Sequence, residues 1–316
     1  MLIKILDSGT MGADTPLDIL STVGEVKKYD QTSPGELHER IKDADVIILN
    51  KVKIDEEAIA AAKHLKLICV FATGYDAIDI KAAKKYNVAV CNVPGYSTES
   101  VTLFTVSTVL SLITHLREYN NFVTSGEYSK SNSANRLIPV YHEASGKTWG
   151  IIGYGNIGKS VAKVAKALGA KVIVYTRTPR EDAVCVDFET LCRESDIITI
   201  HCPLNNETKG IIDEKAISLM KPDVTLVNVA RGAVIDEEAM ARAIENKRIG
   251  AFGSDVYSIE PFNEAHPFYR IMSYHNVLLT PHAAWGSYES RLRCTKAVLE
   301  NIKAFFNGEL KNRVEL

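Results

Sequence analysis

Two spacings of hydrophobic residues alternate along the first hundred residues of the chain. Short apolar runs predict buried β-strands at residues 3–6, 46–49, 67–71 and 88–90. The segments between them carry apolar residues at helical spacing, at 34–42, 54–64 and 78–86. Ser33 before Pro34, with Glu36 in the first turn, is typical of a helix start. Strands that alternate with helices in this way predict a parallel sheet with both faces covered.

A second series of the same kind begins at Thr148. Strands are predicted at 149–152, 171–175, 197–201, 225–228, 250–254 and 276–279. Helices are predicted between them at 157–168, 213–220 and 236–246. This count of strands indicates a six-stranded doubly wound α/β unit. An apolar-rich stretch at 97–116 and a polar, loop-like segment at 124–135 precede it, and a helix at 288–307 follows it with Gly308 as its C-cap.

Length and charge narrow the class of protein. A chain of 316 residues is about two ordinary domains long. Lys and Arg total 37 and Asp and Glu total 39, so the net charge of −2 gives no electrostatic reason to expect nucleic acid or an anionic membrane as a partner. No apolar run approaches the roughly 18 residues that span a bilayer. The N-terminal residues also lack the pattern of a signal peptide, so we expect a cytoplasmic protein.

The six cysteines are scattered along the chain. They form no C-x-x-C pair, and no His cluster lies at metal-ligand spacing. Most of them lie within or beside apolar runs, as Cys69 does. We therefore expect buried free thiols in a reducing compartment and no structural metal.

A glycine-rich loop opens the first helix of the second series. Residues 153–158 read G-Y-G-N-I-G, directly after an apolar strand and directly before an apolar-periodic helix. This context is the one that a dinucleotide-binding fingerprint requires. Gly153 permits the tight turn, Gly155 lets a pyrophosphate approach the backbone, and Gly158 lets the helix pack closely on the strand. The free N–H groups of the helix N-terminus would then face the phosphates.

The next strand ends without the carboxylate that usually holds the ribose 2′-hydroxyl of NAD. Thr176 stands at that position, followed by Arg177 and Arg180. Two cationic side chains at this position suit the 2′-phosphate of NADP better than they suit the uncharged ribose of NAD. The alternative is that both arginines are solvated loop charges and that the cofactor is NAD held without the acid. The residues leave the choice between NAD and NADP open and favour NADP weakly.

Three polar side chains follow three successive strands of the second series: Arg231, Glu260 and His282. Ligands of open α/β sheets bind beyond the carboxyl ends of the strands, so these residues are expected to meet at one site. A guanidinium pairs well with a planar carboxylate. A histidine can donate and accept a proton near neutral pH, and a carboxylate beside it would orient the ring. This set predicts hydride reduction of a 2-oxo acid.

Motifs along nearly the whole chain resemble those of NAD(P)-dependent D-isomer-specific 2-hydroxyacid dehydrogenases. The matching segments are T-G-Y-D at 73–76, N-V-P-G-Y-S at 92–97, the glycine loop, H-C-P-L at 201–204 and the segments around Arg231, Glu260 and His282. The resemblance implies that Arg231 binds substrate, that Glu260 supports the histidine, and that His282 is the acid/base.

The same resemblance implies further ligand contacts. Gly74 would offer a backbone N–H to the substrate carboxylate, and Asp255 would face the nicotinamide carboxamide. The implied substrate residues are Thr73, Gly74, Tyr96, Arg231, His282 and Trp285. The expected cofactor-binding residues are Gly153, Gly155, Asn156, Ile157, Gly158, Thr176, Arg177, Pro203, Thr208, Val229 and Asp255.

The resemblance also implies the outer architecture. A Rossmann cofactor domain, residues 98–283, would be inserted in a discontinuous flavodoxin-like substrate domain of residues 1–97 plus 284–316. The crossings near Ser97 and Ala284 would be hinges, and the crevice between the domains would close on substrate. The family is usually dimeric, which makes the segment 124–135 a candidate contact arm of a homodimer.

Within the family, the segments 92–97 and 281–285 are most similar to glycerate dehydrogenases and hydroxypyruvate reductases. Tyr96 stands where D-lactate dehydrogenases have a substrate-side tyrosine, so pyruvate remains an alternative to hydroxypyruvate and glyoxylate. Glu260 argues against the formate branch, which has Gln there. At 102–104 this chain has T-L-F where the family usually continues with Ala-Glu or Ala-Gln, so packing of this helix is expected to differ.

Two other functions fit the same motifs. Corepressors that sense nicotinamide dinucleotides share the fold and the Arg-Glu-His set, and they act chiefly by binding other proteins. Phosphite dehydrogenases run on the same three residues. Activity with NAD(P)H and a panel of 2-oxo acids would distinguish these alternatives.

Overall fold

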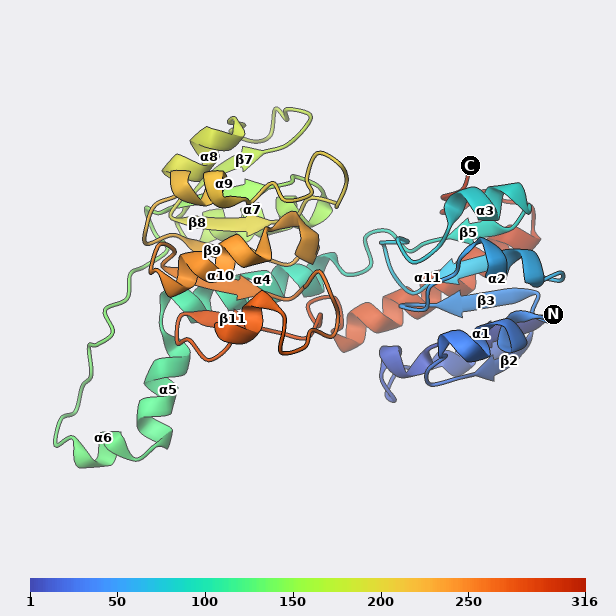
Figure 1. Cartoon of the computed structure of the whole chain (residues 1–316), viewed down its shortest axis with the longest axis horizontal. Helices are drawn as coiled ribbons and strands as arrows, with labels where there is room; N and C mark the ends of the chain where they lie inside the picture. The colour runs from blue at the N-terminus through green and yellow to red at the C-terminus, as the bar shows by residue number, and fades with distance from the viewer. The chain divides into compact units, whose positions relative to one another are not determined.

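The computed structural model describes all 316 residues, which divide into two compact units. Unit 1 consists of Met1–Ser97 and Gly286–Leu316, and unit 2 is Thr98–Trp285 (Figure 1). The first crossing falls where the sequence analysis expects it, between residues 97 and 98. The second lies after Trp285, two residues beyond the expected boundary at 283/284.

Unit 1 is built on a five-stranded parallel sheet in the order β2-β1-β3-β4-β5. Its strands are β1 Leu2–Ile5, β2 Glu25–Lys28, β3 Val46–Leu49, β4 Leu67–Val70 and β5 Ala89–Cys91. Four of these are the predicted apolar runs. The sequence analysis missed β2 because this edge strand pairs only with β1 and three of its four residues, Glu25, Lys27 and Lys28, are charged and exposed.

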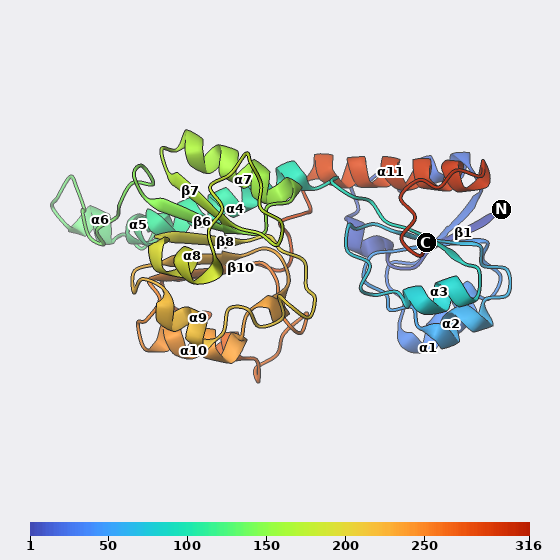
Figure 2. The same cartoon turned by 90° about the horizontal axis from the view of Figure 1, so that it is seen from above.

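Helices cover both faces of the sheet of unit 1. They are α1 Pro34–Ile41, α2 Glu56–Ala61, α3 Ile80–Lys85 and α11 Tyr288–Phe306, with 3₁₀ turns η1 Ser8–Met11 and η2 Leu17–Thr22. Figure 2 shows α11 on one face and α1, α2 and α3 on the other. The predicted start of α1 is confirmed, because the Ser33 N–H and hydroxyl both donate to the Glu36 carboxylate, at 3.0 and 2.6 Å.

Unit 2 is built on a six-stranded parallel sheet in the order β11-β10-β9-β8-β6-β7. Its strands are β6 Thr148–Ile152, β7 Lys171–Tyr175, β8 Ile197–Ile200, β9 Thr225–Asn228, β10 Ala251–Ser254 and β11 Val277–Leu279. All six lie at the predicted positions, and the strand order reverses direction between β6 and β8, as in a doubly wound sheet. The predicted fold class, two parallel α/β units, is confirmed.

Two helical layers enclose the sheet of unit 2. On one face, α4 Thr98–Ile113 and α7 Asn156–Ala167 pack on the sheet around the buried Trp149. The other face carries α8 Phe188–Glu194, α9 Glu214–Leu219 and α10 Glu237–Glu245, with 3₁₀ turns η3 Gly232–Val234 and η4 Pro267–Arg270. The sequence analysis did not predict the short helix α8, which Asp187 caps by accepting from the Thr190 N–H at 2.9 Å.

A helical extension follows α4. Helix α5, Leu116–Thr124, is bent by 65° from α4, and a single turn, α6 Glu127–Lys130, lies within the segment that was predicted to be a loop. Both lead away from the sheet of unit 2 (Figure 1). No single helix is long and apolar enough to cross a membrane, and α4 with α5 reaches the required length only as this bent pair. All six cysteines are free thiols, and five of them are buried.

Candidate functional site

The glycine loop between β6 and α7 is shaped by close backbone contacts. Gly153 has a φ of +93°, and a Cβ atom there would lie 2.6 Å from the backbone nitrogen of Cys202 after β8. A Cβ on Gly158 would lie 2.1 Å from the carbonyl oxygen of Gly153. Both positions therefore exclude any other residue, which supports the steric roles predicted for them.

The space around Gly155 is open, in contrast to its two neighbours. A Cβ atom there would meet no atom within 4 Å. Gly155 is the N-cap of the 12-residue helix α7 and offers no side chain to cap the first N–H groups, which include those of Asn156 and Ile157. Free amides at a helix N-terminus beside open space fit an anionic group such as the pyrophosphate of a dinucleotide.

The end of β7 carries more charge than the sequence analysis considered. Thr176 is half-buried, and Arg177 and Arg180 are exposed. In the same loop, Asp182 pairs with Lys159 of α7 at 3.0 Å, and this contact lowers the pKa of the Asp182 carboxyl. Local spacing gave no signal of this pair, because the partners lie 23 residues apart.

The loop after β8 is held by one hydroxyl. Thr208 Oγ1 donates to the Pro203 carbonyl at 2.6 Å and accepts from the Asn205 N–H at 2.9 Å. The predicted cofactor residues Pro203 and Thr208 therefore close one turn at the carboxyl edge of the sheet. Val229, which directly follows β9, is half-buried at the same edge.

His282 and Glu260 form the central contact of the site. His282 Nδ1 lies 2.6 Å from Glu260 Oε2, and the side chains retain 24% and 29% of their exposure. Glu260 follows β10 and His282 follows β11, as predicted. A carboxylate at Nδ1 fixes the ring and leaves Nε2 as the nitrogen that can exchange a proton with a ligand.

A buried carboxylate shapes the turn that carries His282. This residue has a φ of +53°, an unusual conformation for a side chain other than glycine. Asp255, which is 2% exposed, accepts from Thr280 Oγ1 at 2.7 Å and from the N–H groups of Ala283 and Ala284 at 2.8 and 2.9 Å. Burial raises the pKa of the Asp255 carboxyl, and these hydrogen bonds offset part of the effect. Asp255 thus fastens both sides of the His282 turn.

Arg231 lies at the end of β9 in extended backbone, one residue before η3. Asn228 holds this segment from both sides, because its amide oxygen accepts from the Ala230 N–H and its amide nitrogen donates to the Arg231 carbonyl, each at 3.0 Å. The guanidinium itself donates to the Ala230 carbonyl at 2.8 Å. The structure therefore places all three predicted catalytic residues at the carboxyl edge of one sheet.

The other predicted substrate residues are divided between the units. In unit 1, Thr73 follows β4 and donates to the Val93 carbonyl at 2.8 Å, and Gly74 is the next residue. Tyr96 is 7% exposed, with its hydroxyl 3.5 Å from the Phe71 carbonyl. In unit 2, Trp285 is half-buried.

One half-buried histidine entered the sequence analysis only as part of the H-C-P-L motif, with no role assigned to it. His201 directly follows β8, and burial lowers its pKa to about 3, so the ring is neutral. Neither of its ring nitrogens has a hydrogen-bond partner. In the sequence it is one polar residue after an apolar strand, the same signal that marks His282.

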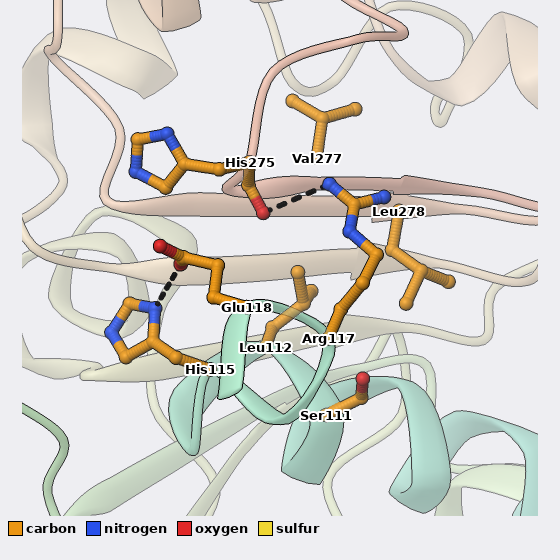
Figure 3. Close-up of a pocket in the computed structure, with 8 residues that line it drawn as sticks. All are labelled: Ser111, Leu112, His115, Arg117, Glu118, His275, Val277 and Leu278. Atoms are coloured by element: carbon orange, nitrogen blue, oxygen red, sulfur yellow. Dashed lines mark hydrogen bonds and ion pairs between the residues drawn. The ribbon is translucent and has the colours of Figure 1, made fainter. Parts of the chain in front are cut away.

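A small pocket of unit 2 contains none of the predicted residues (Figure 3). It lies at the amino edge of β11, beside α5, whereas His282 follows the carboxyl end of that strand. Arg117 donates to the His275 carbonyl at 3.0 Å, and His115 pairs with Glu118 at 2.9 Å (Figure 3). The Arg117 contact fastens α5 to the segment before β11, whereas the His115–Glu118 pair is local to the start of α5.

Comparison with known proteins identifies the family. Residues 106–284 match the family described as "D-isomer specific 2-hydroxyacid dehydrogenase, NAD binding domain". The chain is 33% identical over 323 residues to a hydroxypyruvate reductase of Blautia hydrogenotrophica, covering 99% of both chains. It is 38% identical over 284 residues to a glyoxylate reductase of Thermococcus litoralis, covering 87% of this chain and 85% of the relative.

A solved structure with the same fold supports this family assignment. The D-lactate dehydrogenase of Aquifex aeolicus, complexed with NAD and lactic acid, has a TM-score of 0.88 and 29% sequence identity. The match covers 100% of this chain and 99% of that one. The resemblance stated from the motifs is thereby confirmed. The chain belongs to the family of D-isomer-specific 2-hydroxyacid dehydrogenases, oxidoreductases that transfer a hydride between a nicotinamide dinucleotide and a 2-oxo or 2-hydroxy acid.

Proposed function

We propose that this enzyme reduces a small 2-oxo acid of the hydroxypyruvate or glyoxylate type and that Arg231, Glu260 and His282 carry the reaction. The observation that carries the proposal is the 2.6 Å contact between Glu260 and His282 at the sheet edge that also holds Arg231. The relatives named hydroxypyruvate reductase and glyoxylate reductase support this substrate class. Pyruvate remains an alternative, since a structural neighbour is a D-lactate dehydrogenase.

Each of the three residues has a distinct task in this proposal. Arg231 pairs with the carboxylate of the oxo acid, for which the planar guanidinium provides two parallel donors. His282 donates a proton from Nε2 to the carbonyl oxygen and takes it back in the oxidation direction. Glu260 holds the imidazole at Nδ1 and so directs Nε2 toward the substrate. The bound dinucleotide, on the loop at Gly155, supplies or accepts the hydride.

The remaining predicted contacts belong to the same proposal. Thr73, Gly74 and Tyr96 of unit 1 and Trp285 of unit 2 are proposed substrate residues. Asp255 is proposed to accept from the nicotinamide carboxamide with lone pairs that its protein donors leave unused. The corepressor and phosphite alternatives are not favoured, because the relatives matched over most of the chain are named as reductases of 2-oxo acids.

Replacement of His282 by Ala tests the central assignment. We expect kcat for reduction of glyoxylate or hydroxypyruvate to fall roughly 10²- to 10⁴-fold, the usual contribution of a positioned proton donor. Steady-state kinetics over a panel of 2-oxo acids, with NADH and NADPH, measures this. His275→Ala is the matched control, because His275 is exposed at the opposite edge of the same sheet. A His282→Ala enzyme within a few-fold of wild type would show that another group donates the proton.

Replacement of Arg231 by Lys tests the recognition of the carboxylate. Lysine keeps the positive charge and loses the two parallel donors, so we expect KM for the oxo acid to rise and kcat to fall. Arg193→Lys, an exposed change on α8, serves as the control. Normal kinetics in Arg231→Lys would mean that charge alone recognises the substrate.

The preference for NADP is a separate proposal. We propose that the enzyme accepts NADPH. The residue at the end of β7 is Thr176 and not a carboxylate, so nothing there repels a 2′-phosphate, and the exposed Arg177 and Arg180 can approach that phosphate. Lys159 adds a third cation, although Asp182 already pairs with it. Solvent exposure of the loop weakens each of these ion pairs.

The ratio of kcat/KM for NADPH to that for NADH measures this preference. We expect a ratio near or above one in wild type and a lower ratio in Arg177→Ala, with Arg193→Ala as a control that leaves it unchanged. A wild-type ratio far below one that Arg177→Ala does not alter would refute the proposal.

We also propose that the protein is a homodimer whose contact includes the extension after α4. Helix α5 has no buried residue. The segment that follows α6 carries Leu137, Ile138 and Val140 at 76%, 71% and 67% exposure. Exposed apolar side chains gathered in one short segment are typical of a protein–protein contact.

Light scattering after size-exclusion chromatography tests this proposal. We expect wild type to elute with twice the mass of the chain and the double variant Leu137→Asp/Ile138→Asp to shift to the monomer. Leu310→Asp, which is 68% exposed in unit 1, is the control. A wild-type monomer, or a double variant that remains dimeric, would show that this segment does not form the contact.

A further inference from the structure

The three loops that carry Arg231, Glu260 and His282 meet at two consecutive residues, Tyr257 and Ser258. On the side of Arg231, the contact is steric. A Cβ atom on Gly232, the next residue after Arg231, would lie 2.0 Å from the carbonyl carbon of Tyr257 and 2.2 Å from the nitrogen of Ser258. Gly232 therefore lets the two loops touch through their backbones, and a shift of one displaces the other.

Tyr257 joins the other two loops by hydrogen bonds. Its backbone N–H donates to Glu260 Oε1 at 3.0 Å, which leaves Glu260 Oε2 for His282. Its hydroxyl donates to the Thr280 carbonyl at 2.8 Å, two residues before His282. Burial raises the pKa of the Tyr257 hydroxyl, so it stays protonated as this donor requires. The residue thus links the carboxylate of the pair to the turn that carries the imidazole.

A buried carboxylate holds Ser258 from the other side. Glu237, the first residue of α10, is 8% exposed. Its Oε1 accepts from the Ser258 N–H at 2.8 Å, and its Oε2 accepts from the Ser258 hydroxyl. The same Oε2 lies 2.9 Å from His266 Nε2. The position at a helix N-terminus also favours the negative charge.

The His266 ring lies against Glu237 at ion-pair distance, although its Nε2 does not meet the geometry of a hydrogen bond. Its Nδ1 accepts from the Phe268 N–H at 3.2 Å, which assigns the ring proton to Nε2, on the side of Glu237. The ring is 6% exposed and stacks on Phe262 with centroids 4.9 Å apart. Both carboxylate oxygens of Glu237 therefore accept from Ser258, and the buried His266 ring closes the other side of Oε2.

We propose that Glu237, packed against His266, is a positioning residue that sets the Glu260–His282 pair through residues Tyr257 and Ser258. This inference rests on the proposed function of that pair. Glu237 touches neither substrate nor cofactor in it. Its task is to keep the Tyr257 N–H directed at Glu260, so that the carboxylate stays at hydrogen-bond distance from His282 Nδ1.

Glu237→Gln tests the inference with little change in volume. One carboxylate oxygen becomes an NH₂ group, which accepts nothing, so either the Ser258 N–H loses its acceptor or the Ser258 hydroxyl has to turn from donor to acceptor. The Ser258 peptide then moves away from Glu237, and the Tyr257 N–H moves with it. We expect kcat to fall about 10- to 100-fold, the cost of a lost supporting contact or a displacement near 1 Å at reacting groups. Affinity for the dinucleotide should stay within about twofold, because the glycine loop is untouched.

A double-mutant cycle separates positioning from general damage to the fold. The variants are Glu237→Gln, Glu260→Gln and both together, with kcat, dinucleotide affinity by fluorescence titration and melting temperature measured for each. If Glu237 acts through Glu260, its replacement should cost little further kcat once Glu260 is already Gln. Glu238→Gln is the matched control, since Glu238 is the exposed next residue of α10 and pairs with Arg270 at the surface. Ser258→Ala, which removes one donor and no charge, should give a smaller loss with the same dependence on Glu260.

The possible results distinguish failure of the inference about Glu237 from failure of the proposed function of Glu260 and His282. Normal kcat in Glu237→Gln and Ser258→Ala, with kcat reduced in Glu260→Gln, would overturn the inference and leave the proposed function intact. The same loss from Glu237→Gln in both backgrounds would also overturn it, because the effect would then bypass Glu260. Normal kcat in Glu260→Gln would refute the role of the pair itself and the inference with it. If Glu237→Gln does not fold, Ser258→Ala in both backgrounds decides the question.

Discussion

The parallel alignment of six strands in unit 2 is the constraint on which the site depends. In a parallel sheet all carboxyl ends lie at one edge, so residues that follow β9, β10 and β11 come together although up to 51 positions separate them along the chain, from Arg231 to His282. The same edge holds the glycine loop after β6. One topological rule therefore places the proposed proton-transfer pair, the proposed carboxylate-binding arginine and the glycine loop on one rigid support.

Buried carboxylates without cationic partners hold the loops at this edge in place. Asp255 accepts three hydrogen bonds around the His282 turn, and Glu237 accepts from the Ser258 N–H and hydroxyl. A buried charge is costly unless hydrogen bonds satisfy it, and here backbone N–H groups and neutral side chains do so. These carboxylates resist any movement of the loops, because displacement would leave the charge unsatisfied. Rigid support of this kind suits a site that has to keep an imidazole and a carboxylate 2.6 Å apart.

Local sequence patterns were sufficient to predict most of the strands and the longer helices. Ten of the eleven strands are apolar runs, and burial on both faces of a parallel sheet requires such runs. The edge strand β2 was missed because exposure removes that requirement. The short helix α8 and the turn α6 were missed because four to seven residues give too few turns to show a helical period. The glycine loop was recognised because its steric needs are local.

The sequence by itself determined the alternation of strands and helices and the glycine loop, and it singled out Arg231, Glu260 and His282 as candidates, since each depends on residue type next to a strand or helix end. Only the tertiary structure decided which groups hold them. The contacts of Asp255 with Ala283 and Ala284 span 28 and 29 positions, and the contact of Glu237 with Ser258 spans 21. No spacing rule reaches so far, because the geometry of such contacts is set by how the intervening chain packs.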